Sequence, residues 1–354
     1  MINRKRQGTQ LKFKTMLYCV LLILVSSCKD RSTAHTAFYF WKTVFQLKPG
    51  EKELLRSAAN NRLYLRFFDI VWNKQELQAL PNGVIAFKES VSALSITPVI
   101  YITNQSLQQT APSGIDSLAF KANRLLVRLA AENGIVYKDI QIDCDWSVST
   151  KTRYFAFLRA FKRYNRKKLE ATIRLHQVKY PERTGVPPVD KGLLMFYNMG
   201  KISAALNVRN SIYNPEDAAA YIAALPHYHL PLDVALPAFS WAIQIRADKV
   251  VQSYAKISLA ELSNPQNFEQ ISSGSLSVPA FTALKSFYLK GVYVKTGDVF
   301  KFEGTDHEIL AAAAKQVSAY LAPLNNRTVI YYEISSVNLL PLYAKDIKEI
   351  SAHF

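Results

Sequence analysis

The chain alternates short apolar runs, rich in β-branched and aromatic residues, with longer segments whose apolar residues recur at helical spacing. This alternation predicts repeated strand–helix units. Eight runs are predicted strands: 37–43, 62–70, 96–103, 139–147, 169–179, 192–200, 232–242 and 329–336. The clearest predicted helices are 117–133, 150–164, 215–225, 307–321 and 342–350.

Eight strand–helix units predict an α/β fold, a (β/α)₈ TIM barrel. Such barrels take about 250 residues, so a chain of 354 has room for insertions. We predict an insertion at 244–306, between strands 7 and 8, with a hairpin at 286–304 that turns at Thr296-Gly297-Asp298. A doubly wound open sheet is the alternative fold. No Gly-x-Gly-x-x-Gly motif follows the first strand and no Walker loop is present, so nucleotide binding has no support.

The N-terminal segment has the pattern of an export signal. A short apolar run, 16–27, follows a basic region and is too short for a typical transmembrane helix. The run ends in Leu24-Val25-Ser26-Ser27-Cys28, which resembles the bacterial lipobox, where the cysteine becomes lipid-modified. We therefore predict a lipoprotein signal peptide at 1–27, a lipidated tether at 28–36 and the barrel at 37–354. An ordinary signal peptide with an incidental cysteine is the alternative.

The next residues and the other cysteines bear on the compartment. Lys29-Asp30 is similar to the start of the surface-export signal of Bacteroidetes lipoproteins, which predicts a bacterial protein anchored by lipid at the outer membrane or cell surface. Removal of Cys19 and lipidation of Cys28 would leave Cys144 as the remaining thiol, so no disulfide is expected. No Cys/His spacing suits zinc, and we predict neither a metal nor a cofactor.

The net charge of +17 suggests an anionic partner at first sight. Five of these charges come from residues 1–27, which hold no acidic residue, so the chain without them carries +12. The dense basic cluster lies at 159–168 and ends in Arg166-Lys167-Lys168, and no nucleic-acid-binding motif accompanies it. We predict no specific nucleic-acid partner and interpret the charge as a solvated surface or as loose attraction to an anionic membrane or polymer. The oligomeric state stays open.

Acidic residues gather where the fourth predicted strand ends. Strand alternation places Asp143, Asp145 and Ser147 on one face. Functional side chains of barrels come from the carboxyl ends of the strands, and two carboxylates about 7 Å apart raise one another's pKa. The alternative is a structural pair neutralised by Arg or Lys from neighbouring strands.

The stretch 140–147 resembles the fourth-strand signature Asp-x-x-Asp-x-Asp-x-Glu of family 18 glycoside hydrolases, the chitinase-like barrels. Segment 195–198 resembles their Met-x-Tyr-Asp motif, and 235–239 their Gly-hydrophobic-Pro-x-Tyr motif. The chain is also similar to uncharacterised lipoprotein barrels of the same clan. The resemblance implies a carbohydrate-active barrel of the cell envelope that acts on or binds a glycan containing N-acetylhexosamine or a related sugar. It implies catalytic roles for Asp143, Asp145 and Tyr197.

Two positions depart from that signature. Ile140 stands where the family has its first Asp, and Ser147 where it has the Glu that protonates the leaving oxygen. A serine hydroxyl is far too weak an acid for that role near neutral pH. Glu333, near the end of the eighth strand, and Asp69, at the end of the second, are the candidate replacement acids. Whether the chain is an enzyme stays open: the alternatives are a catalytically inactive glycan-binding lipoprotein and a structural surface lipoprotein.

Further polar and aromatic residues near strand ends are candidates for substrate binding. They are Asp69, Trp146, Asn198, Trp241 and His176. The competing interpretation is that Asp69 and Glu333 pair with Arg66 or Arg174, that His176 is structural, and that the tryptophans, with Trp41 and Trp72, pack in the core.

Overall fold

The computed structural model describes residues 34–58, 60–272, 274, 276–335, 342 and 344–354. The predicted signal peptide, most of the predicted tether and Cys28 lie outside the described residues. Residues from Ala34 to Phe354 form one compact unit. Within the described ranges no helix is long and apolar enough to cross a membrane.

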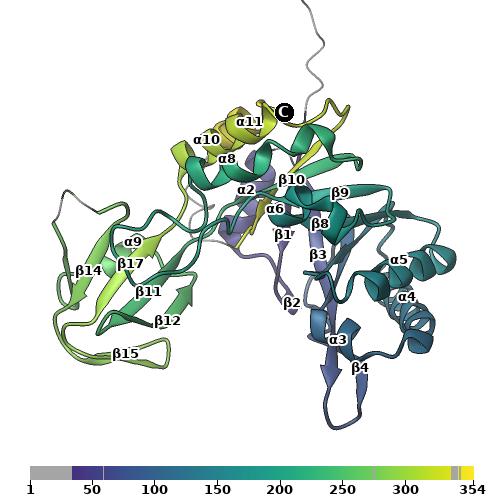
Figure 1. Ribbon diagram of the computed structural model, residues 1–354, viewed down its shortest axis with the longest axis horizontal. Coiled ribbons are helices and arrows are strands. Elements are labelled where there is room, and N and C mark those ends of the chain that lie inside the picture. The colour runs from purple at the N-terminus through teal and green to yellow at the C-terminus, as the bar shows by residue number, and fades with distance from the viewer. Residues whose placement is uncertain (1–33, 59, 273, 275, 336–341, 343) are drawn as a thin grey trace, which may run out of the picture. The chain divides into compact units, whose positions relative to one another are not determined.

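A closed parallel barrel forms the centre of the protein (Figure 1). Strand β1 pairs with both β3 and β18, which closes the sheet. The predicted TIM-barrel fold is confirmed. The barrel strands are β1 (His35–Phe40), β3 (Arg62–Asn73), β6 (Ser95–Ile102), β7 (Asp139–Asp143), β8 (Lys168–Arg174), β9 (Lys191–Met195), β10 (Leu232–Pro237) and β18 (Thr328–Tyr332).

Helices cover the outside of the barrel. Apolar side chains along one face of each longer helix pack against the outward-facing residues of the strands. The helices are α2 (Pro49–Ser57), α3 (Asn104–Gln109), α4 (Ile115–Glu132), α5 (Lys151–Tyr164), α6 (Leu175–Lys179), α7 (Pro181–Thr184), α8 (Pro215–Ile222), α10 (His307–Ser318) and α11 (Ala344–Ser351).

Two helix starts follow from local chemistry. The Asn214 side chain accepts a hydrogen bond from the backbone N–H of Asp217 and Pro215 takes the first helical position, so α8 begins there. Asp306 caps α10 in the same way, by accepting from the N–H of Ile309.

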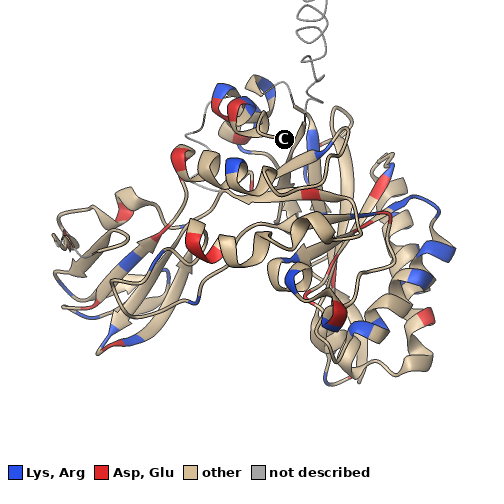
Figure 2. Cartoon of the chain, turned by 45° about the horizontal axis from the view of Figure 1, so that its top comes forward, with Lys and Arg blue, Asp and Glu red and all other residues tan. Residues whose placement is uncertain are grey.

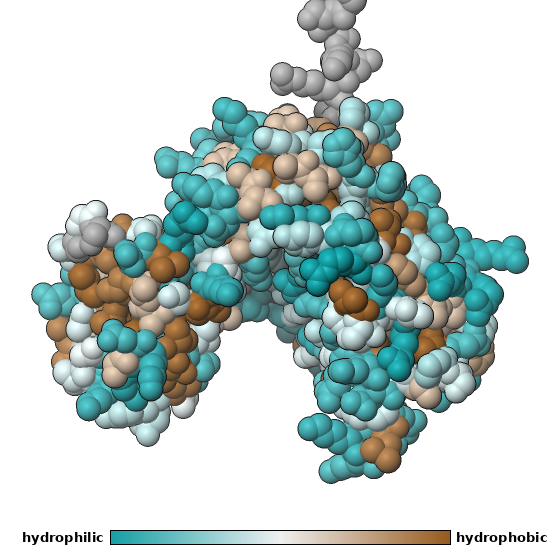
Figure 3. Space-filling view, in the orientation of Figure 1, coloured by the Kyte–Doolittle hydropathy of each residue, from teal (hydrophilic) through white to brown (hydrophobic). Residues whose placement is uncertain are grey.

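An antiparallel sheet is inserted between β10 and β18, as predicted. Its strands run in the order β12-β11-β17-β14-β13, and a core of aromatic residues that includes Tyr254, Phe268 and Phe300 lies on it. Apolar side chains also reach the surface of this insertion (Figure 3). The strands are β11 (Trp241–Arg246), β12 (Lys249–Ala255), β13 (Phe268–Gln270), β14 (Ala280–Ala283) and β17 (Val299–Glu303), and α9 (Leu259–Leu262) lies between β12 and β13.

The predicted hairpin at 286–304 is wrong in its turn. The hairpin strands are β15 (Phe287–Leu289) and β16 (Val292–Val294), and the chain reverses at Lys290-Gly291, both at positive φ. The turn at Gly297 instead leads into β17, which pairs with β11 and β14. Asp298 fixes this second turn because its carboxylate accepts from the Lys295 N–H and pairs with Arg246.

Several barrel strands end earlier than the sequence pattern predicts. β7 ends at 143 rather than 147, β8 at 174 rather than 179, β9 at 195 rather than 200 and β10 at 237 rather than 242. β3 instead continues to Asn73 and pairs with β4 (Gln78–Asn82) beyond the barrel. A small pair, β2 (Val44–Phe45) with β5 (Ala86–Phe87), completes the sheets.

Candidate functional site

A cavity of about 340 Å³ opens at the mouth where the barrel strands end. Asp143, Arg174 and Tyr332 are the last residues of β7, β8 and β18, and all three line it. This mouth is the end of a TIM barrel that carries functional side chains. The structure brings together Asp143, Asp145, Tyr197, Asn198, Trp241 and Glu333 of the predicted site residues.

The two aspartates differ in their partners. Asp143 is buried and accepts one hydrogen bond at 2.7 Å from the Thr172 hydroxyl. Burial raises the pKa of Asp143 to about 6, against the Thr172 hydrogen bond and with a contribution from the charge of Asp145. Asp145 is more exposed and holds a two-pronged ion pair with Arg174, in which Nη2 lies 2.6 Å from Oδ2. The alternative interpretation of the two aspartates is a structural pair neutralised by a basic residue of a neighbouring strand. Arg174 of β8 is such a residue, and it also lines the cavity.

Tyr197 follows β9 and lines the cavity, and its hydroxyl is buried. Among the described residues, its hydroxyl has no hydrogen-bond partner. Its ring stacks on Tyr332 at 5.8 Å and meets Phe239 edge-on at 5.6 Å. Burial raises the pKa of Tyr197 well above its usual value, so the phenol stays protonated and can donate a hydrogen bond to a ligand. Asn198 adopts a φ of 56°, a conformation that asparagine tolerates better than most residues.

Glu333 adds a third acid directly after β18, and the peptide bond that joins it to Tyr332 is cis. Its side chain is buried, and Oε1 lies 2.5 Å from Nζ of Lys256, which follows β12 of the insertion. Oε2 has no hydrogen-bond partner in the part of the chain that the structure describes. The insertion thus supplies one charged residue of the cavity wall.

Aromatic rings form much of the remaining wall. Trp41, Phe239, Trp241 and Tyr332 are half-buried and contact one another, with ring centres 5.9 Å apart for Trp41–Tyr332 and 5.5 Å for Phe239–Trp241. The Trp241 indole N–H donates to Glu303 at 2.9 Å, which fixes the ring. Partly exposed rings beside carboxylates and a free phenol suit a ligand that has both apolar faces and hydroxyl or amide groups.

Three predicted site residues lie outside the cavity wall. Trp146 is a correction: it is 1% exposed, stacks on Tyr154 in the helical layer and donates its indole N–H to the Thr184 carbonyl. His176 is a second correction, because β8 ends at Arg174 and His176 lies exposed on α6. Asp69 pairs with Arg66, whose guanidinium lies 5.5 Å above the Trp41 ring, so this pair supports the wall from behind.

Ser147 also lies outside the wall. The predicted alternation stops because β7 ends at Asp143, and the Ser147 hydroxyl contacts that of Ser149 at 2.8 Å. Ser147, which corresponds to the acid of the family signature, thus lies in the loop between β7 and α5.

Sequence reasoning missed several wall residues. Lys256 and Ser240 come from the insertion and its connection, and Tyr101 is the penultimate residue of the neighbouring strand β6. The sequence could have indicated Tyr332 as a wall residue, because it directly precedes Glu333 in the same predicted strand. It could not have indicated Lys256, since only the fold of the insertion brings that residue to the barrel.

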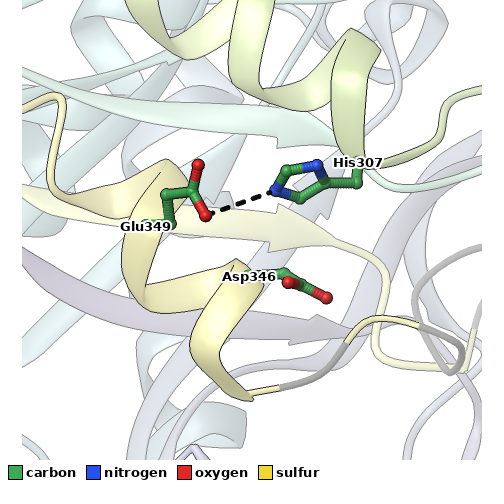
Figure 4. A group of neighbouring side chains, drawn as sticks. All are labelled: His307, Asp346 and Glu349. Atoms are coloured by element: carbon green, nitrogen blue, oxygen red, sulfur yellow. Dashed lines mark ion pairs between the residues drawn. The ribbon is translucent and has the colours of Figure 1, made fainter.

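A second cavity and a group of possible metal ligands lie elsewhere in the protein. A larger cavity of about 960 Å³ lies beside the first turns of α8 and α10, with mainly apolar walls, and its Asn214 and Asp306 are engaged as helix caps. In the described ranges, one group could hold a metal ion: His307, Asp346 and Glu349 bring ligand atoms within 4.8 Å of one another (Figure 4). Nε2 of His307 lies 3.8 Å from Oε2 of Glu349. Neither feature shares a residue with the 340 Å³ cavity.

Comparison with known proteins identifies the fold. No protein-family model and no curated protein sequence matches the chain. The spore cortex-lytic enzyme SleL of Bacillus cereus matches in structure with a TM-score of 0.56 and 13% identity, over 91% of this chain and 74% of that one. A chitinase from Chromobacterium violaceum matches with 0.56 and 13%, over 90% and 98%. A GH18 chitinase variant from Cycas revoluta, in complex with (GlcNAc)4, matches with 0.51 and 12%, over 90% and 99%.

Proposed function

We propose that the cavity at the C-terminal mouth binds a glycan that contains N-acetylhexosamine or a closely related sugar. The observation that carries this proposal is the combination of half-buried rings with two buried polar groups, the Tyr197 hydroxyl and Glu333 Oε2, that find no hydrogen-bond partner among the residues described. Sugar rings offer apolar faces that stack on aromatic rings, and their hydroxyl and acetamido groups pair with phenols and carboxylates. The likeness in fold to chitinases and to a cortex-lytic enzyme supports this ligand class.

Calorimetric titration with chitin tetrasaccharide tests the proposal, with cellotetraose as the ligand that lacks acetamido groups. We expect Trp41→Ala to weaken tetrasaccharide binding about five- to tenfold, as expected for loss of one aromatic contact. Trp72→Ala is the matched control, because Trp72 lies on the β3–β4 extension and is not part of the cavity wall. No binding of chitin or peptidoglycan fragments, or equal losses in the two variants, would contradict glycan recognition and favour a structural role.

Hydrolysis is a second candidate function of the same site. It is favoured by Asp143, whose pKa of about 6 leaves it partly protonated near neutral pH, and by the buried Glu333. In this scheme one of these acids protonates the leaving oxygen in place of the Glu that the family signature carries. Asp145, held by Arg174, orients the substrate.

Release of reducing ends from chitin and peptidoglycan fragments distinguishes cleavage from binding. If the protein cleaves, Glu333→Gln or Asp143→Asn should lower turnover by about 10²-fold or more. Ser147→Ala is the matched control and should leave turnover unchanged. Tight binding without any release of reducing ends assigns the site to recognition alone.

We also propose that the protein is a lipoprotein of the bacterial cell envelope, anchored through Cys28. The support is the apolar run 16–27 with its lipobox-like end. Fractionation of cells expressing wild type or Cys28→Ala tests it: only wild type should partition with membranes. Equal partitioning of the two forms contradicts the anchor.

A further inference from the structure

The mouth opposite the cavity, where the barrel strands begin, carries exposed basic residues. Arg62 begins β3, Lys138 precedes β7, and Arg166-Lys167-Lys168 leads into β8. The Lys168 N–H donates to the Lys138 carbonyl, so the loops before β7 and β8 lie side by side. In Figure 2 basic residues are also seen on α4 and α5, the helices that these loops follow.

The basic residues of this mouth have few acidic neighbours to neutralise them. In the described ranges, none of the five forms an ion pair. The acids nearby are engaged elsewhere: Asp190 pairs with Lys162, and the buried Glu170 and Asp233 share Lys191. Asp139 is the remaining acid beside the opening. The mouth therefore presents an excess of positive charge.

An exposed apolar residue stands among these cations. Val136 is 90% exposed, although Ile135 before it is buried and Tyr137 after it is half-buried. Lys138 follows in the same loop, and Nζ of Lys167 lies 6.0 Å from the centre of the Tyr137 ring. A single exposed valine is ordinary by itself. Next to lysines, in a loop joined to its neighbour by the Lys168–Lys138 backbone hydrogen bond, it is placed to enter an apolar layer while the lysines contact anionic groups.

A cavity of about 630 Å³ opens at the same mouth. Its wall includes Arg62, Lys138, Lys168 and Val136, together with His35, the first residue of β1, and it also includes the acids Asp139, Glu170 and Asp190. The exposed Arg62, Lys138 and Lys168 are the groups of this wall that can bind the phosphate of a lipid headgroup.

The start of the barrel gives the orientation. Ala34 lies six residues after Cys28, and six residues span at most about 21 Å. A lipid on Cys28 therefore keeps this mouth, which includes His35, near the bilayer. This argument for the orientation of the mouth depends on the proposed lipidation of Cys28. The positive charge of the mouth and the exposure of Val136 are independent of it.

We propose that the N-terminal mouth of the barrel, defined here by Arg62, Val136, Lys138 and residues 166–168, docks on an anionic lipid bilayer. The glycan-binding cavity then faces away from the membrane. Docking fixes how the barrel is oriented on the bilayer, which a flexible lipid anchor by itself does not do. Each lysine or arginine near an anionic surface strengthens binding about fivefold, so a few of them have a large combined effect.

Co-sedimentation with vesicles tests the surface without the lipid. The protein is residues 29–354, which retains every contact of the described residues. We expect it to bind vesicles that contain phosphatidylglycerol, not vesicles of phosphatidylcholine alone, and to dissociate as salt is raised. The triple variant Arg166→Ser, Lys167→Ser, Lys168→Ser should bind at least tenfold more weakly.

The matched control removes three exposed lysines elsewhere, by Lys74→Ser, Lys249→Ser and Lys285→Ser. It should bind as wild type does. Equal losses in the two triple variants, or equal binding to soluble polyphosphate, would overturn docking at this mouth in favour of general attraction between charges. Chitin tetrasaccharide titrations on the same variants should not change, so this proposal and glycan binding can fail separately.

A fluorophore sensitive to polarity tests the orientation. It is attached to Val136→Cys or, as control, to Leu77→Cys, which is 73% exposed on the turn between β3 and β4, past the opposite mouth. Cys144 is buried and should not react. Vesicles should shift the emission of the label at 136 to the blue and leave the label at 77 unchanged. No shift at 136, or a shift at 77, would overturn the proposed orientation.

Discussion

Two clusters of acids, tyrosines and cations lie inside the barrel, and they differ in how completely their polar groups are paired. The lower cluster, toward the mouth where the strands begin, is Tyr64, Glu170, Lys191 and Asp233. The upper cluster, at the mouth where the strands end, is Asp143, Tyr197 and Glu333 with Lys256. In the lower cluster Lys191 lies 3.1 Å from Glu170 and 2.5 Å from Asp233, and the Tyr64 hydroxyl donates to Glu170. The other oxygen of Asp233 accepts from the Thr328 N–H. Asp233 Oδ2 of the lower cluster has no hydrogen-bond partner among the described residues, but it is ion-paired with Lys191. In the upper cluster the Tyr197 hydroxyl and Glu333 Oε2 have neither a hydrogen bond nor an ion pair within the described ranges.

The raised pKa values do not separate the two clusters. Burial raises the pKa of Asp143 to about 6 in the upper cluster and that of Glu170 to about 7 in the lower one. A shifted pKa therefore reports burial in both places. The unsatisfied groups are what mark the upper cluster as ligand-facing, because leaving a buried polar group without a partner is costly unless something binds it.

The largest expected effect comes from opening the lower cluster. Lys191→Met removes the cation that Glu170 and Asp233 share and should lower the free energy of unfolding by about 3–5 kcal/mol. Because Lys191 lowers the pKa of Glu170, its removal raises that pKa further above about 7. The loss should therefore grow as pH rises above 7, where Glu170 of the wild type is ionised and paired. Urea denaturation measures it. Lys162→Met, which breaks the exposed pair with Asp190, is the control and should cost about 1 kcal/mol or less. Similar losses would remove the distinction between the clusters.

A pair of tyrosine variants tests the contrast directly. Tyr64→Phe removes a donor to Glu170 and should cost about 1–3 kcal/mol of stability without changing glycan affinity. Tyr197→Phe should change stability by less than about 0.5 kcal/mol but weaken glycan binding about fivefold. Denaturation measures the stability of both variants, and calorimetric titration measures their glycan affinity. A loss of affinity in Tyr64→Phe together with a loss of stability in Tyr197→Phe would contradict the assignment of the two clusters.

The pH dependence of stability gives a smaller effect. Because the pKa of Asp143 is about 6 when folded and about 4 when unfolded, the folded protein binds more protons between these values. The free energy of unfolding should therefore fall as pH rises from about 4 to 6, by about 1 kcal/mol or more. Asp143→Asn should remove this part of the fall and keep the part due to Glu170, which extends to about pH 7. An unchanged profile in Asp143→Asn contradicts the raised pKa.

The smallest effect is expected at Ser147. Sequence alternation implies that Ser147→Glu would place an acid beside Asp145, but the hydroxyl contacts Ser149 in the loop before α5. We expect Ser147→Glu to change neither glycan affinity nor reducing-end release by more than about twofold, since surface substitutions rarely have large effects. A gain of hydrolysis would place this loop nearer the cavity than the structure does.

The sequence predicted the barrel and its longer helices because their signals are local: apolar periodicity, and caps such as Asn214 and Asp306. Strand ends were predicted less well. Past Asp143 the chain still alternates in burial, since Cys144 and Trp146 are buried, but Trp146 is satisfied by the Thr184 carbonyl and no longer lies on a barrel strand. A pattern of buried and exposed positions does not show where pairing between strands stops.

The candidate site was predicted only in part, because local patterns indicate strand ends but not contacts between distant segments. Asp143, Asp145 and Tyr197 lie at or just past strand ends, so barrel geometry alone brings them together. The partners of these acids depend on distant segments. Lys256 reaches Glu333 only because the insertion folds against the barrel, and no local pattern near residue 256 indicates this contact.

The filled interior also decides how a ligand can travel. Tyr39 donates to Gln141, Gln141 donates to Glu170, and Glu170 meets Lys191, so side chains block the barrel axis beneath the cavity. The upper cavity is therefore closed at its base and does not connect with the cavity at the opposite mouth. Whatever enters at the upper mouth must leave by it, and a polymer cannot thread through the molecule. A long glycan can be engaged only by its end or lying across the opening, so each encounter begins and ends on the same face.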